Sequence, residues 1–138
     1  MSTRNLTGAK IGFVLAALNI PALLMGVATG GLVASILGLV IGGALTLVET
    51  GNGADIGLVV GVLAGLIAGG WVAGHRAPHS SRFHGSMSGL LLAVVLMVIA
   101  RFGGSPAGPA VVAWFALLSI VVSGVSGWLA GRRKDRLA

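Results

Sequence analysis

Three histidines and two arginines lie close together near the middle of the chain, in the stretch GGWVAGHRAPHSSRFHG. His75, His79 and His84 are the only histidines of the sequence, and Arg76 and Arg82 lie between them. Imidazole nitrogens bind zinc, copper and nickel, and three of them would leave one coordination position open. However, a proline interrupts the spacing i, i+4, i+9, and the two arginines repel a cation. The pattern therefore does not favour a metal site.

The same residues suit an anionic partner better. Arginines, histidines and the hydroxyls of Ser80 and Ser81 together resemble a cradle for a lipid phosphate. The other interpretation is a cytoplasmic turn that fixes the topology and contacts only water, and the two roles are compatible. The residues expected to contact a lipid head group are Arg76, His79, Arg82 and His84.

The sequence offers little else for catalysis. Its only acidic residues are Glu49, Asp55 and Asp135. A histidine that acts as a general base without a nearby acid lacks the partner that orients it. The motifs of zinc proteases, serine hydrolases and phosphate-binding loops are absent. We therefore expect no enzymatic activity, no catalytic or metal-binding residue and no cofactor. A lipid-modifying enzyme with His79 or His84 as the base is the weakest alternative.

The segments that flank these residues are strongly apolar. Of the 138 residues, 56% are hydrophobic and 9% are charged, and the mean hydropathy is +1.03. Soluble domains carry about 25% charged residues. So few charges cannot cover a soluble globule, whereas lipid-facing surface needs no polar cover. The composition predicts a single integral membrane domain over residues 1–138.

The net charge of +6 does not indicate a nucleic-acid partner. Nucleic-acid binding requires a basic face on a soluble fold, and here the basic residues lie at the ends of apolar runs. Such placement is typical of the positive-inside bias and of contact with anionic head groups. We therefore expect the plasma membrane of a bacterium or archaeon, with residues 132–138 as a basic cytoplasmic tail.

Polar and turn-rich interruptions separate the apolar runs. They predict membrane-spanning helices over residues 56–74, 85–101 and 110–131, each near the ~20 residues that cross a bilayer. Residues 11–48 carry no charge, and as one helix they would be about 57 Å long, which is too long for one crossing. The break lies either at Asn19-Ile20-Pro21, where Asn caps and Pro begins a helix, or in a tight turn at residues 28–31.

Charge placement helps to choose between these possibilities. If the basic residues near both ends are cytoplasmic, residues 11–48 cross the membrane an odd number of times. This favours one helix over 20–48, preceded by an interfacial or re-entrant segment over 1–19. The predicted fold is thus an all-α, polytopic transmembrane helical bundle with four crossings. The alternative is five crossings with the N-terminus outside.

The 24 glycines follow a helical spacing. Residues four apart share a helix face, and glycine on that face lets another backbone come close. We therefore predict tight helix packing, with a partner in the same chain or in another copy. The residues that carry this prediction are Gly57, Gly61, Gly65 and Gly69, with Gly70 and Gly74 on the neighbouring face.

No charged residue is expected deep in the membrane, so the sequence shows no evident proton relay or ion site. Ser119, Ser123 and Ser126 are among the deepest polar residues. We expect their hydroxyls to bond to carbonyls of their own helix, which is the usual arrangement. The alternative is that they line a thin polar path.

Two motifs resemble a group of small prokaryotic four-helix membrane proteins of unknown function. In that group one helix ends in Gly-Gly-aromatic-x-Ala-Gly-x-Arg, and a His-Gly pair begins the next. GGWVAGHR matches the first motif at residues 69–76, and His84-Gly85 matches the second. The resemblance covers about residues 30–134, and the apolar stretch before Asn19 departs from it. It implies four crossings with both termini inside, and no activity.

The apolar helices, the glycine spacing and the lack of buried ionisable groups predict a non-enzymatic membrane protein that acts by helix packing. It would be an accessory subunit of a membrane complex or a homo-oligomer. The expected partners are membrane lipids, especially anionic ones, and other subunits or copies of the chain. A small channel, pore-forming protein or transporter is the main alternative.

Overall fold

The computed structural model describes residues 19–48, 51–78, 80–104 and 108–135. These residues form four helices and no strand. Each helix is long and apolar enough to cross a membrane. The structure therefore confirms the predicted fold class, an all-helical bundle with four membrane-spanning helices. The helices are α2 (Ile20–Leu47), α3 (Gly53–Arg76), α4 (Ser81–Phe102) and α5 (Pro109–Asp135).

The start of α2 has the features expected of a helix N-terminus. The side-chain oxygen of Asn19 accepts a hydrogen bond from the backbone N–H of Ala22 at 3.3 Å. Pro21 lies in the first turn of the helix. Backbone N–H groups there have no partner within the helix, so proline, which has no N–H, costs no hydrogen bond. The helix then continues through residues 28–31, so the alternative break there is wrong. Residues 1–18 of the predicted interfacial segment lie outside the described residues.

The other three helices extend beyond the predicted spans at their polar ends. α3 includes His75 and Arg76, and α4 begins at Ser81 rather than at Gly85. α5 continues to Asp135, so the segment predicted as a basic tail from residue 132 begins within a helix. The chain thus keeps its helical hydrogen bonds past the apolar core and into the region where head groups lie.

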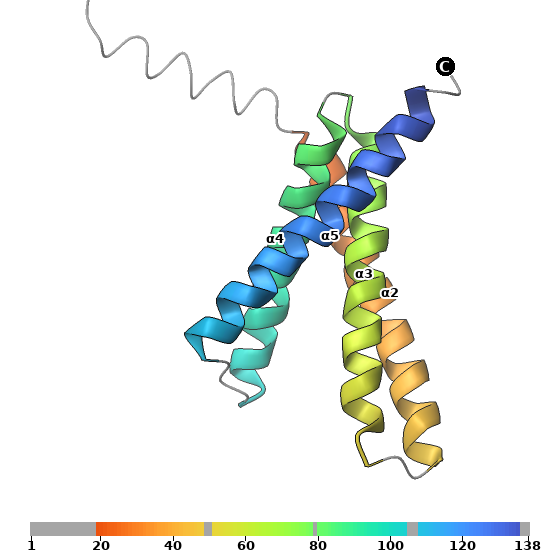
Figure 1. Ribbon diagram of the computed structural model, residues 1–138, viewed down its shortest axis with the longest axis vertical. Coiled ribbons are helices and arrows are strands. Elements are labelled where there is room, and N and C mark those ends of the chain that lie inside the picture. Colours follow the sequence, from red (N-terminus) through yellow and green to blue (C-terminus); the bar gives the residue numbers. More distant parts are fainter. Residues whose placement is uncertain (1–18, 49–50, 79, 105–107, 136–138) are drawn as a thin grey trace, which may run out of the picture.

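The four helices form two pairs arranged as a V (Figure 1). One arm is α2 with α3, and the other is α4 with α5. At the converged end, all four helices meet where α2 and α4 begin and α3 and α5 end. At the open end the arms separate: α2 ends and α3 begins at the tip of one arm, and α4 ends and α5 begins at the tip of the other.

Glycines hold α2 and α3 together along their whole length. A Cβ atom placed on Gly61 would lie 2.5 Å from the carbonyl oxygen of Ala34 and 2.7 Å from Cα of Gly38. These distances are shorter than real atoms tolerate, so the two backbones touch directly and only glycine fits. The same relation repeats along the helix, with Gly57 against Gly42, Gly65 against Gly30, and Gly69 against Gly26.

The close glycine contacts between the two arms, among the described residues, lie toward the converged end. There, Gly70 and Gly74 of α3 lie against Ser123 and Gly127 of α5. Toward the open end, the surfaces between the arms carry small residues of α2 together with larger side chains, such as Leu58 of α3 and Leu96 of α4. Bulky side chains keep helix axes further apart than glycines do. The V therefore opens beyond the last close glycine contact between the two arms.

Candidate functional site

The six glycines predicted to pack serve two different helices. Gly57, Gly61, Gly65 and Gly69 face α2, whereas Gly70 and Gly74 face α5. All six are buried. Helical register explains the division, because Gly70 is rotated by about 100° from Gly69. For these glycines, the partner that the sequence left open lies within the same chain.

His84 lies in the interior of the converged end. Its side chain is 1% exposed, and Nε2 accepts a hydrogen bond from the backbone N–H of Asn19 at 3.1 Å. Nδ1 must then carry the ring proton, which it donates to the Ser80 carbonyl oxygen at 3.2 Å. The neutral imidazole thus joins the start of α2 to the start of α4. A ring enclosed in this way is not available to a lipid head group, contrary to the expectation from the sequence.

The other two histidines differ in what the structure describes of them. His75 is exposed at the end of α3, and His79 lies outside the described residues. Within the ranges that the structure describes, no three histidine or acidic side chains are grouped so that they could hold a metal ion.

The arginines are distributed unequally between the two ends of the bundle. Arg76 and Arg82 are both exposed at the converged end, where the end of α5 adds Arg132 and Arg133. The guanidinium of Arg132 lies 3.9 Å from the ring centre of Trp128, a cation–π contact. Arg101 lies near the open end instead. The converged end therefore presents the larger positive charge among the described side chains.

The buried serines of α5 stabilise helix contacts. Ser119 donates to the Phe115 carbonyl of its own helix at 2.7 Å, as expected. Ser123 and Ser126 differ from the expectation, because they donate across to carbonyl oxygens of α3 at 2.8 and 2.6 Å. The acceptors are Leu66 and Ile67. These hydroxyls join the two arms of the V instead of lining a polar path.

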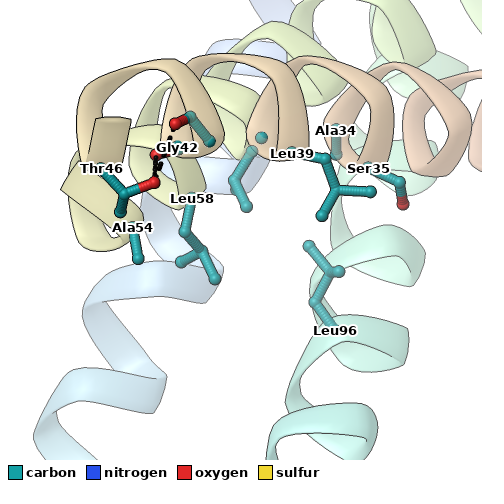
Figure 2. Close-up of a pocket in the computed structure, with 11 residues that line it drawn as sticks. Ala34, Ser35, Leu39, Gly42, Thr46, Ala54, Leu58 and Leu96 are labelled. Atoms are coloured by element: carbon teal, nitrogen blue, oxygen red, sulfur yellow. Dashed lines mark hydrogen bonds between the residues drawn. The ribbon is translucent and has the colours of Figure 1, made fainter. Parts of the chain in front are cut away.

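An inner groove lies between the two arms of the V (Figure 2). Its volume is about 550 Å³, and α2 forms one side with small residues, among them Ser35, Gly38 and Gly43, and with Leu39, which is 77% exposed. Leu58 of α3 and Leu96 of α4 contribute larger side chains (Figure 2). A Cβ added to Gly43 would meet no atom within 4 Å. Gly38 contacts α3, so the positions of α2 in this groove that no other described helix covers include Ser35 and Gly43, with Leu39 between them.

An outer groove of about 450 Å³ lies nearer the converged end. α2 contributes Met25 and Leu32, and α3 contributes Trp71, Val72 and Arg76. By helical register, these residues project from the side of the α2–α3 contact opposite to that of the inner groove. The outer groove therefore faces away from α4 and α5.

Comparisons with known protein families, with curated proteins and with solved structures found no match. The resemblance to small prokaryotic four-helix membrane proteins stays a prediction. The interpretation of this chain depends on the contacts, burial and charges described above.

The buried imidazole provides the first test. His84→Ala removes the acceptor of the Asn19 N–H and leaves a cavity, so we expect the free energy of unfolding to fall by about 1–3 kcal/mol. Unfolding in mixed micelles, followed by circular dichroism, measures this change. His75→Ala is the control, because that side chain is exposed and its removal should change stability little. Equal stability of the two variants would contradict the structural role of His84.

Proposed function

We propose that this protein is a non-enzymatic membrane protein that acts through helix packing, and that copies of it associate through the inner groove. The observation that supports this proposal is the uncovered small-residue surface of α2. Ser35 and Gly43 are exposed there, in a segment that is otherwise apolar. Apolar side chains gain little by leaving lipid for one another, whereas small residues allow the close approach that drives helices together.

The rest of the bundle shows how such surfaces are used. The glycines of α3 that face α2 and α5 are covered by backbone of those helices. Ser35 and Gly43 in the inner groove are small as well, but no other described helix covers them, and Leu39 lies between them. A second copy supplies a matching surface, because α2 can pack against α2 about a two-fold axis. We therefore favour a homo-oligomer over an accessory subunit.

Cysteine cross-linking tests the proposed interface directly. The natural chain contains no cysteine, so each introduced thiol is unique. Ser35→Cys in purified protein at low density in vesicles should give a disulfide-linked dimer on mild oxidation. Leu117→Cys, on an exposed position of α5, should stay monomeric. The measurement is the fraction of dimer on a non-reducing gel.

A second variant separates association from folding. Gly43→Leu fills the inner groove where an added side chain meets nothing of its own chain, so the monomer should fold and the dimer should be lost. If Ser35→Cys cross-links only to a different protein in native membranes, the accessory-subunit alternative is correct. Monomer in both the purified and the native samples would refute association through this groove.

We also propose that the protein lies in the plasma membrane with its converged end and its C-terminus in the cytoplasm. The exposed arginines at the converged end support this orientation, because basic residues flanking membrane helices are retained on the cytoplasmic side. Asp55 lies in the first turn of α3, at the open end.

Labelling with a membrane-impermeant thiol reagent tests the orientation. In intact cells, Asn52→Cys near the tip of the α2–α3 arm should react, because both flanking helix ends face outward in this topology. Ser80→Cys, in the connection at the converged end, should react only after the cells are broken. The reverse pattern would place the C-terminus outside.

A further inference from the structure

We infer that the outer groove binds a single anionic phospholipid, with the phosphate at Arg76 and an acyl chain along the apolar surface between α2 and α3. The groove lies on the side of the α2–α3 contact opposite to the inner groove, so this inference does not depend on self-association. The inference assigns a binding site to Arg76, one of the four residues that the sequence predicts to contact a lipid head group.

The upper rim of the groove is suited to a phosphate. Arg76 and His75 are exposed in the last turn of α3, at the level where a membrane-spanning helix leaves the hydrocarbon. None of the described residues that line the groove is acidic, so none of them neutralises the guanidinium. Guanidinium binds phosphate oxygens with paired, charge-assisted hydrogen bonds. The rim thus favours a ligand with negative charge.

The wall below the rim is suited to an acyl chain and not to a free phosphate ion. Met25 and Leu32 of α2 and Val72 of α3 form an apolar surface directly beneath Arg76. Met25 and Leu32 are 44% and 63% exposed, so their side chains remain available to a ligand. A ligand that matches both parts carries a phosphate at one end and a hydrocarbon chain at the other.

The charge of the surroundings favours anionic over zwitterionic lipid. Arg82, Arg132 and Arg133 are exposed at the same end of the bundle. Each basic residue near a bilayer surface favours an anionic lipid by about 1 kcal/mol, which corresponds to about a fivefold preference. We expect Arg76 to contribute about this factor, because it alone among these arginines lines the groove.

Trp71 lines the same groove and reports on the lipid beside it. The chain has three tryptophans, and Trp114→Phe with Trp128→Phe leaves Trp71 as the only one. This variant is reconstituted into phosphatidylcholine vesicles that contain increasing amounts of lipid with brominated acyl chains. Bromine quenches tryptophan only at short range. Brominated phosphatidylglycerol should bind beside Trp71 about fivefold more strongly than brominated phosphatidylcholine.

Two arginine variants show whether the groove causes this preference. Arg76→Gln should reduce the ratio of the two binding constants to about one. Arg101→Gln removes an exposed arginine near the open end, away from the groove, and should leave the ratio unchanged. Native mass spectrometry of the chain with all three tryptophans gives an independent readout: Arg76→Gln should lose bound phosphatidylglycerol and Arg101→Gln should keep it. Equal quenching by both lipids, or a preference that survives Arg76→Gln, would overturn the inference.

Discussion

The arrangement of the bundle depends on direct contact between the backbones of α2 and α3. In lipid, helices associate where close approach increases van der Waals contact, since burying apolar side chains gains little. Gly57 lies against Gly42 near the open end, and Gly69 against Gly26 near the converged end, so this contact runs the length of one arm. Among the described residues, glycines that contact the other arm lie toward the converged end. Both the V and its inner groove follow from that distribution.

Polar side chains complete the converged end. His84 bonds to the backbone of Asn19, and Ser123 and Ser126 bond to carbonyls of α3. The backbone N–H of Asn19, at the start of α2, has no partner within the helix and needs one in a membrane, whereas the serine hydroxyls bond to carbonyls within the continuous helix α3. These three side chains therefore have structural roles, which leaves exposed groups such as Arg76 to interact with lipid. Packing in the inner groove and lipid in the outer groove then use opposite sides of the same helix pair.

Much of this fold could be predicted from the sequence, because length and apolarity alone define membrane helices. The Asn19-Ile20-Pro21 break and the glycine spacing of α3 were visible as local patterns. The sequence shows which face of a helix carries small residues, but it does not show which other helix packs against that face. It also could not show that His84 is buried, because a histidine at a membrane boundary has the same sequence context whether its ring meets lipid or another backbone. The sequence likewise could not show whether the hydroxyls of Ser123 and Ser126 bond to carbonyls of their own helix or to those of α3.

The stability of Gly61→Ala relative to Gly31→Ala tests the central role of backbone contact most directly. Both substitutions lie within helices and gain about 1 kcal/mol of helix propensity, so their difference isolates packing. An added methyl on Gly61 meets the α2 backbone, whereas on Gly31 it meets only Leu92 at 3.9 Å. In mixed-micelle unfolding, Gly61→Ala should be less stable than Gly31→Ala by about 1–3 kcal/mol. Equal stability would contradict the account.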